Sequence, residues 1–336
     1  MSVDSKILKN PPDFKKFISL FKFQLTLPKK TDHKRSKGSA VVIGGSLLRG
    51  AASRLTSEML LRSAVGGVHL FEVGAPRLST RERFFLAGEW IELHDLREVK
   101  ALLKSDLKSL VFGPGLPPLQ DQKARKKIAK KCLLILKLIS HNVHAPMVVD
   151  GGGLVFFAEA LKKGMKFHSP VVLTPHPKEA SDLLKILRPS LAKKVPSSHR
   201  ESLFRCLQTT LSQYSLAKGS VVLLKGPNSI FSQIDSFGNS SKISSQVWAM
   251  NFASSQLATP GSGDVLAGLI AAHFHFLNPP SLALLALALS LNIQKNSVKK
   301  RRKFPHSPVI IARDQVKIFS DLAFKQFSRI QKMGNL

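Results

Sequence analysis

The sequence predicts an α/β protein with a single domain, built on a central, mostly parallel sheet with helices on both faces. Three observations carry this prediction. Short apolar runs rich in β-branched residues alternate with helical patterns. Each of these runs ends in polar residues together with glycine or proline. Hydrophobic residues make up 43% of the 336 residues, which is enough for one large core.

The first β-α-β unit begins with the strand Ala40-Val-Val-Ile43, which runs into Gly44-Gly-Ser46. A helical pattern from Gly50 to Ala64 follows, and Val68–Val73 is the second strand. Four more strands follow at intervals: Ser109–Phe112 before Gly113-Pro-Gly115, Pro146–Asp150 before Gly151-Gly-Gly153, Pro170–Thr174 before Pro175-His-Pro177, and Ser220–Leu224 before Lys225-Gly-Pro227. Because ligands bind at the carboxyl edge of an open parallel sheet, we expect these loops to converge on one site.

The most informative stretch is Leu257-Ala-Thr-Pro-Gly-Ser-Gly-Asp264, which directly precedes the apolar run Val265–Ala272. A glycine-rich loop that opens a helix presents free N–H groups to anions, above all phosphate. A carboxylate there repels phosphate, but it suits a site where Asp264 takes the proton of a hydroxyl that attacks phosphorus. The alternative is an ordinary helix start, since Gly and Ser are common at that position. The chain has neither a P-loop nor a G-x-G-x-x-G after its first strand.

The formal net charge is +30, and two interpretations compete. One is a polyanionic partner, either nucleic acid or an acidic membrane. The other, which we favour, is a lysine bias laid over an ordinary fold, because the chain has one Tyr and no aromatic-and-basic pattern. The basic run Lys123–Lys131 predicts the solvated face of a helix that continues to Ile139. The run Lys299–Lys303 predicts a loop between two elements; a nuclear-localisation or RNA-contact patch is the alternative, for which a short basic run is a weak signal.

Several features predict a cytoplasmic protein without a membrane segment. The apolar run Leu282–Leu291 is too short to span a bilayer. Phe17–Phe21 is too short, and too interrupted by lysine, for a secretory signal. Cys132 and Cys206 match no metal or redox spacing. We expect a basic amino-terminal extension with a lead-in helix at residues 1–37, the domain at 38–325, and a carboxyl-terminal tail at 326–336.

Taken in order, these motifs resemble the ADP- or ATP-dependent NAD(P)H-hydrate dehydratases of the ribokinase-like superfamily. The resemblance runs from about His33 to about Asp314. It is carried by Gly44-Gly-Ser with Gly50-Ala51, Gly113-Pro-Gly-Leu116, Val149-Asp-x-x-Gly-Leu154, Leu173-Thr-Pro-His-Pro-x-Glu179, Leu224-Lys-Gly226 and the loop that ends at Asp264. It implies a ribokinase-like domain and the repair of hydrated NADH or NADPH, in which nucleotide-dependent phosphorylation of the C6 hydroxyl is followed by phosphate elimination.

The resemblance also implies a role for each matching residue. Asp264 would accept the hydroxyl proton, and the N–H groups of Gly261, Ser262 and Gly263 would hold the transferred phosphoryl group. Magnesium would be bound largely through phosphate and water, with Glu179 as its water-mediated partner. The adenine nucleotide, ADP or ATP, would lie against Lys225, Gly226, Pro227, Asn228 and Ser229. The hydrated dinucleotide would contact Ala51, Gly115, His176 and Asp264. The family precedent is a homo-oligomer, often a tetramer.

Each of these residues also has a purely structural interpretation. His176 between two prolines could close a rigid turn, and Asp150 could cap one. Lys225 could be a surface lysine, and Ala51 and Gly115 could be small only because packing is close. The order in which the motifs occur favours the functional interpretation.

The sequence also departs from the family pattern. Gly152 replaces the second acid of an Asp-Ala-Asp element, Lys178 replaces a glycine, and Ala253–Gln256 replaces a glycine- and asparagine-rich stretch. The family's His-Gly and Gly-Asp pairs are replaced near Leu291–Lys295. These departures leave open a small-molecule kinase, or a catalytically decayed member that binds nucleic acid.

Overall fold

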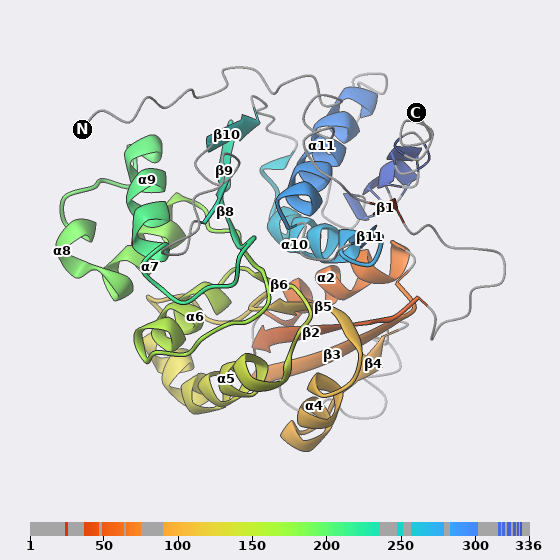
Figure 1. Cartoon of the computed structure of the whole chain (residues 1–336), viewed down its shortest axis with the longest axis horizontal. Coiled ribbons are helices and arrows are strands. Elements are labelled where there is room, and N and C mark those ends of the chain that lie inside the picture. Colours follow the sequence, from red (N-terminus) through yellow and green to blue (C-terminus); the bar gives the residue numbers. More distant parts are fainter. Residues whose placement is uncertain are drawn as a thin grey trace.

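In the computed structural model, residues 24–25, 37–46, 49–63, 65–74, 90–234, 247–250, 257–278, 283–301 and parts of 315–330 are described. Nine strands of this part form one sheet (Figure 1). In spatial order they are β10 (Val247–Met250), β9 (Ser229–Gln233), β8 (Val221–Leu224), β7 (Val171–Leu173), β6 (Met147–Val149), β5 (Leu107–Phe112), β2 (Ser39–Ser46), β3 (Gly67–Gly74) and β4 (Ile91–Glu92). Pairing is parallel from β4 to β8 and antiparallel from β8 to β10. The predicted mostly parallel sheet is therefore confirmed.

All six strands expected from the sequence are present, and their apolar runs are continuous because both faces of the sheet are covered. Along β2 the side chains alternate between two cores. Val41 and Ile43 pack into one cluster, and Ala40 and Val42 pack into the other. A continuous β-branched run at the centre of a parallel sheet is thus explained by burial on both sides.

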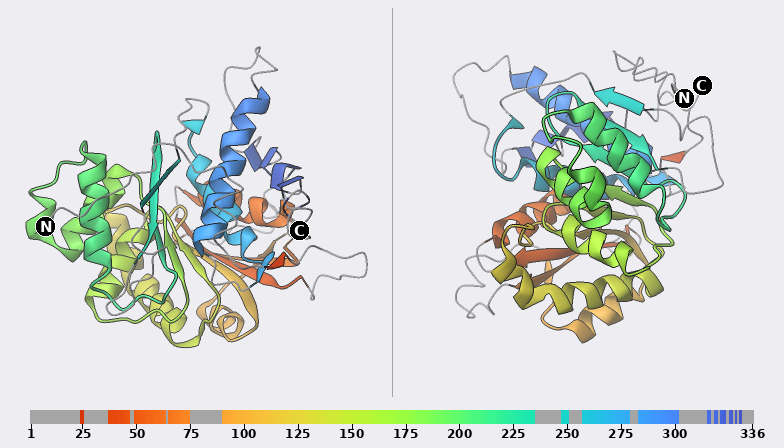
Figure 2. Two further views of the ribbon diagram at one scale, coloured as in Figure 1. Left: turned by 45° about the horizontal axis from the view of Figure 1, so that its top comes forward. Right: turned by 90° about the vertical axis from the view of Figure 1, so that its left-hand side faces the viewer.

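One helix layer consists of α4 (Leu96–Leu103), α5 (Gln122–Asn142), α6 (Gly153–Lys162), α7 (Pro177–Leu187) and α9 (Arg200–Leu211), with the short α8 (Pro189–Ala192) between the last two. The other layer holds α2 (Gly50–Arg62), α10 (Ser262–His273) and α11 (Ala283–Arg301) (Figures 1 and 2). A helix that follows a parallel strand begins at the carboxyl edge of the sheet. The first turns of α2, α5, α6 and α7 therefore lie on the edge where the glycine- and proline-rich loops emerge.

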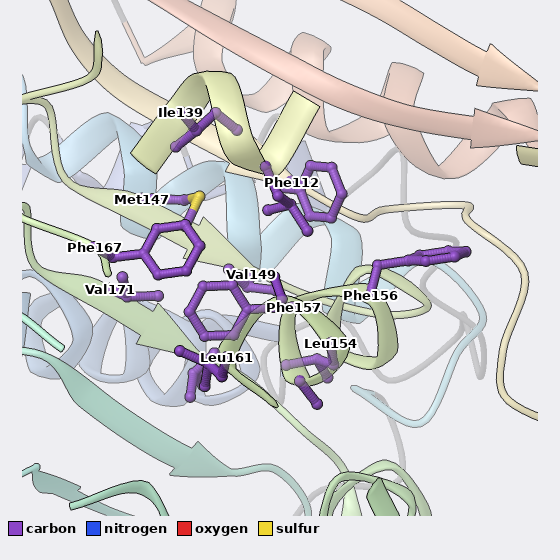
Figure 3. Packing of buried hydrophobic residues seen from close by; sticks show 14 of the residues in the cluster. Phe112, Ile139, Met147, Val149, Leu154, Phe156, Phe157, Leu161, Phe167 and Val171 are labelled. Carbon is purple, nitrogen blue, oxygen red and sulfur yellow. The ribbon is translucent and has the colours of Figure 1, made fainter. Parts of the chain in front are cut away.

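The first layer is held by a dense aromatic and aliphatic core around α6. Phe156 and Phe157 are fully buried, and the ring of Phe157 lies 4.6 Å, centroid to centroid, from that of Phe167 (Figure 3). Phe112 and Val149, at the ends of β5 and β6, pack into the same cluster. The loops that follow these two strands therefore start from rigid positions.

The structure agrees with some of the elements expected from the sequence and differs from others. The predicted helices at Gly50–Ala64 and Lys123–Ile139 correspond to α2 and α5. The prediction that Lys299–Lys303 forms a loop is wrong for its first three residues, which end α11; the other two lie outside the described residues. The lead-in helix within 1–37 also lies outside them, but that segment contributes β1 (Gln24–Leu25), which pairs antiparallel with β11 (Leu277–Asn278). Gln326 and Ile330, in the predicted tail, are buried.

Candidate active site

The loops after β5, β6, β7 and β8 meet at the carboxyl edge of the sheet, beside the first turn of α10. Gly263 shows this proximity directly. A Cβ atom on Gly263 would lie 3.2 Å from Lys225 Nζ and 3.8 Å from Asp150 Oδ2. Residues from three distant segments, at 150, 225 and 263, therefore come together as the sequence predicted for the edge of a parallel sheet.

The first turn of α10 is shaped by Gly261, the residue before the helix. Its φ of +89° is in the left-handed region that favours glycine. The N–H of Ser262 donates to Thr259 O at 3.1 Å, so this amide is used inside the loop. Among the described residues, the amides of Gly261, Gly263 and Asp264 have no backbone acceptor, and those of Gly263 and Asp264 lie in the first turn, at the positive end of the α10 dipole. Of the three amides predicted to hold the phosphoryl group, that of Ser262 is used inside the loop, whereas those of Gly261 and Gly263 are available to an anion, as is that of Asp264.

Lys225 and Asp150 form a buried ion pair next to that turn. Lys225 Nζ lies 2.6 Å from Asp150 Oδ1, and the two side chains are 18% and 3% exposed. The hydroxyl of Thr174 donates to the same carboxylate oxygen at 2.6 Å. Lys225 is therefore not a surface lysine, and Asp150 does not cap a turn. Thr174 is a residue that the sequence reasoning did not single out.

Asp264 titrates in an unusual environment. Burial, followed by the negative charge of Asp150, raises the pKa of its carboxyl to about 7, while the ammonium of Lys225 opposes the shift. Burial disfavours the charge of Lys225, but Asp150, Glu179 and Asp264 together raise its pKa above the ordinary value. The carboxyl of Asp264 is therefore close to half-ionised at neutral pH, which suits a general base. Its backbone carbonyl accepts a hydrogen bond from Thr56 of α2 at 3.0 Å, which fixes the turn.

His176 and Glu179 form a capping box at the start of α7. The Nδ1 atom of His176 accepts from the Glu179 N–H at 3.2 Å, and Glu179 Oε2 accepts from the His176 N–H at 2.8 Å. The structural interpretation of His176 thus holds as far as its Nδ1 is concerned. Its Nε2 atom lies 3.5 Å from Glu179 Oε1, and the side chain is 48% exposed, so part of the ring is accessible. Glu179 Oε2 also lies 3.9 Å from Lys225 Nζ, which links α7 to the ion pair.

The loop after β2 packs closely against the loop after β5. The N–H of Gly45 donates to Pro114 O at 2.8 Å. A Cβ atom on Gly115, whose φ is +76°, would lie 2.2 Å from Arg49 O, so glycine is required there for close packing. Ala51, in the first turn of α2, is exposed. Both predicted substrate contacts, Ala51 and Gly115, therefore lie on the same edge of the sheet, next to Arg49, the N-cap residue of α2.

The loop after β8, which carries Lys225, Gly226, Pro227, Asn228 and Ser229, has an irregular backbone. Gly226 has a φ of +131° and Asn228 a φ of +52°. The hydroxyl of Ser229 donates to Gly226 O at 3.0 Å, and the Lys225 N–H donates to Pro175 O at 2.8 Å. Lys225 is directed inward to Asp150, which separates it from the rest of this predicted nucleotide segment.

The departure at Gly152 has a steric cause. A Cβ atom there would lie 2.1 Å from Leu116 O and 2.6 Å from Pro117 O, both of them backbone atoms. The chain therefore has no room for the second acid of the family pattern. Lys178 is exposed on α7, and Leu291–Lys295 lies within α11. Ala253–Gln256 lies outside the described residues.

The donor chemistry of the site fits magnesium. Asp150, Glu179 and Asp264 offer only oxygen atoms, the ligands that this ion prefers. In the described segments, no three acidic, histidine or cysteine side chains are grouped closely enough to hold a metal by themselves. The residues present therefore suit an ion whose remaining ligands are phosphate oxygens and water.

Comparison with solved structures establishes the class of fold. A ribokinase-like superfamily protein of Enterococcus faecalis matches over 90% of this chain and 92% of its own, with a TM-score of 0.64 and 18% identity. The ADP/ATP-dependent NAD(P)H-hydrate dehydratase of Bacillus subtilis, co-crystallised with ATP and Mg2+, matches over 95% and 99%, with a TM-score of 0.63 and 19% identity. Fold and site together define a ribokinase-like protein. The family model described as NAD(P)H-hydrate dehydratase matches residues 40–302, and the chain belongs to that family.

Curated relatives agree with this assignment. The bifunctional NAD(P)H-hydrate repair enzyme of Dictyoglomus turgidum is 26% identical over 261 residues, which is 75% of this chain and 44% of that protein. The ADP-dependent (S)-NAD(P)H-hydrate dehydratase of Listeria monocytogenes is 25% identical over 305 residues, 88% of this chain and 94% of that protein. The chain spans less than half the length of the bifunctional relatives. None of the helices described in the structure is long and apolar enough to cross a membrane.

Proposed function

We propose that this protein restores hydrated NADH and NADPH by a nucleotide-dependent dehydration. The observation that carries the proposal is the position of Asp264, a carboxyl with a pKa of about 7 placed in the first turn of α10 beside the Lys225–Asp150 pair. A base, free amides and a fixed ammonium in one place are the components of a phosphoryl-transfer site. Membership of the dehydratase family supports the identity of the substrate.

In the proposed reaction the oxygen of the C6 hydroxyl attacks the terminal phosphorus of the nucleotide, and Asp264 takes the proton of that hydroxyl. The bond between that phosphorus and the nucleotide breaks, and the C6 oxygen becomes a phosphate ester. The amides of Gly261, Gly263 and Asp264 and the ammonium of Lys225 offset the charge on the transferred group. Phosphate then leaves C6 and a proton leaves C5, which restores the ring double bond.

The remaining predicted residues take positions around this centre. Ala51, Gly115 and His176 contact the hydrated dinucleotide on the side of α2 and α7. The adenine nucleotide contacts Gly226, Pro227, Asn228 and Ser229. The ammonium of Lys225 contacts the transferred phosphate. Glu179 would hold magnesium through water; when bound, the ion neutralises phosphate charge. ADP or ATP as donor, a homo-oligomer such as a tetramer, and a cytoplasmic location are further parts of this proposal.

The test is an absorbance-recovery assay. Hydrated NADH is incubated with the protein, magnesium and either ADP or ATP, run side by side, and the near-ultraviolet absorbance of reduced nicotinamide is followed. We expect recovery that needs both nucleotide and magnesium and stops when the metal is chelated. A phosphorylated product that accumulates without recovery would instead identify a small-molecule kinase. No turnover at all, with salt-sensitive retention of nucleic acid, would identify a decayed member of the family.

A further inference from the structure

Arg200, the first residue of α9, belongs to none of the motifs that the sequence offers. Its guanidinium reaches across to the loop after β8 and donates to three backbone carbonyls of that loop. Nη1 donates to Pro227 O, and Nη2 donates to Lys225 O at 3.2 Å and to Leu224 O at 3.4 Å. One side chain from another helix thus holds the end of β8 and two peptide groups of the segment expected to bind the nucleotide.

The loop needs such support because its backbone is irregular. Gly226 and Asn228 both have positive φ values, a conformation that glycine and asparagine adopt more readily than other residues, so the loop forms no regular secondary structure that would hold it. Gly226 also makes room for Arg200, because a Cβ atom there would lie 3.0 Å from Nη1. The Nε atom of Arg200 is buried without a partner among the described residues, so the hydrogen bonding of this side chain is concentrated on the loop.

We propose that Arg200 is a positioning residue for the adenine nucleotide: its planar fork fixes the backbone of Lys225–Asn228 in the conformation that binds. This rests on the proposed function, which assigns that loop to the nucleotide. Arg200 suits this task because a guanidinium has donors at fixed angles, which can serve several carbonyls at once. A lysine ammonium at the same position is a point charge on a flexible stem and cannot replace that fork. Arg200 acts on nucleotide affinity and not on the chemical step, since the ammonium of Lys225 is held by Asp150 and the turn of Asp264 by Thr56.

The experiment compares Arg200→Lys and Arg200→Gln with the unaltered full chain. The dissociation constants of ADP and ATP are measured by calorimetry, and steady-state constants by the recovery assay. We expect both variants to bind nucleotide about tenfold more weakly and to show a correspondingly higher KM for nucleotide. The value of kcat at saturating nucleotide, and the KM for hydrated NADH, should stay within twofold. Arg205→Lys and Arg205→Gln are the matched controls, since Arg205 lies on the same helix and, within the described part of the chain, pairs with Glu201 alone, at 2.8 Å.

Two results would overturn the inference: nucleotide dissociation constants within twofold of the unaltered protein, or a loss confined to kcat. Melting curves establish whether the variants fold. If Arg200→Gln does not fold, the inference is tested with Arg200→Lys alone, because this variant keeps the positive charge. The binding measurement separates the role of Arg200 from the proposed repair of hydrated NADH. A protein that binds nucleotide but does not repair hydrated NADH contradicts the proposed function and still tests Arg200. A protein that binds no nucleotide contradicts both.

Discussion

Asp150, Glu179 and Asp264 bring three carboxylates around the single ammonium of Lys225. The ion pair between Lys225 and Asp150 is short and buried. Glu179 is held by the capping box of α7. Burial and the negative charge of Asp150 raise the pKa of Asp264 to about 7. A carboxyl whose pKa is shifted by burial and by a specific charged neighbour is typical of catalytic sites.

Two neighbouring charges should move the pH dependence of the reaction in opposite directions. Because the proposed role of Asp264 is that of a base, we expect kcat/KM to rise with pH through about 7. Asp150→Asn removes a negative charge that raises this pKa, so the rising limb should move to lower pH by roughly half a unit to one unit. Lys225→Met removes the opposing positive charge, so its limb should move to higher pH. The measurement is a pH–rate profile of the recovery assay.

The control uses a second lysine–aspartate pair of similar geometry on α7. Lys185 Nζ lies 2.8 Å from Asp182 Oδ1, and Asp182 is buried. Asp182→Asn and Lys185→Met should leave the rising limb where it is. Shifts of the same sign in Asp150→Asn and Lys225→Met would contradict the electrostatic account of Asp264.

The same shift predicts how stability depends on pH. A carboxyl whose pKa in the folded state lies above its ordinary value keeps its proton when the unfolded chain has released it, so stability falls as pH rises from about 4 to about 7. Asp264→Asn removes that penalty and should raise the free energy of unfolding by roughly 1–3 kcal/mol at about pH 8. Near pH 4 the gain should largely vanish. Urea unfolding at the two pH values measures it, and a gain independent of pH would contradict the assigned burial.

At this scale the sequence indicated which residues meet at one edge of the sheet, but not which of them pair with one another. The motif order singled out Asp264, Lys225, His176 and Glu179, and all of them lie at one edge of the sheet. It could not show that Lys225 turns inward to Asp150, because that pairing joins residues 75 positions apart. Nor could it show that the Ser262 amide is used by Thr259, since loop hydrogen bonds depend on local backbone angles.

Among the elements, the start of α6 is the most tightly constrained. Gly152 precedes this helix with ordinary helical backbone angles, so only space, and not conformation, requires glycine. The peptide groups of Leu116 and Pro117 occupy the position of a side chain. A larger residue at 152 must therefore push apart the loops after β5 and β6, the two strands that end at the site.

Gly152→Ala should accordingly destabilise the protein by about 3 kcal/mol or more. Gly67→Ala is the matched control in β3, where the nearest atom is the Ser39 hydroxyl at 3.3 Å, which can rotate away; we expect a change of less than about 1 kcal/mol there. Thermal or urea unfolding of both variants provides the comparison. Equal stabilities for the two would show that the loops after β5 and β6 are not rigidly packed.

The alternation of apolar runs and helical patterns predicted the six buried strands and the helices α2 and α5. It missed β9 and β10, whose residues are only partly buried and therefore show no continuous apolar run. It also placed Lys299–Lys303 in a loop because of its charge, whereas Lys299, Lys300 and Arg301 continue α11. Lysine and arginine are good helix formers, so charge alone does not end a helix.

At the scale of the whole molecule, part of the net charge of +30 lies near the candidate site. The exposed lysines Lys123, Lys126 and Lys127 lie in the first half of α5, which starts at the carboxyl edge of the sheet. Asp121, the N-cap of α5, pairs with Arg49 beside the predicted substrate contacts. Positive potential at the mouth of a site attracts anionic substrates and speeds their association.

We therefore expect kcat/KM for the nucleotide to fall as ionic strength rises, while kcat stays constant. The double variant Lys126→Glu, Lys127→Glu should weaken that salt dependence. The control is Lys162→Glu, Lys163→Glu at the end of α6, on the opposite edge of the sheet, where the same charge change should have a smaller effect. Equal effects in the two variants would attribute the charge to the whole surface and not to the site.

The most direct measurement of the central claim is the recovery assay with Asp264→Asn, run beside calorimetric titration of nucleotide. Removal of the base should lower kcat by at least about a hundredfold, and nucleotide affinity should change little because the free amides and Lys225 remain. If the Asn variant restores hydrated NADH at the rate of the unaltered protein, Asp264 is not the base and the assignment of the site is wrong.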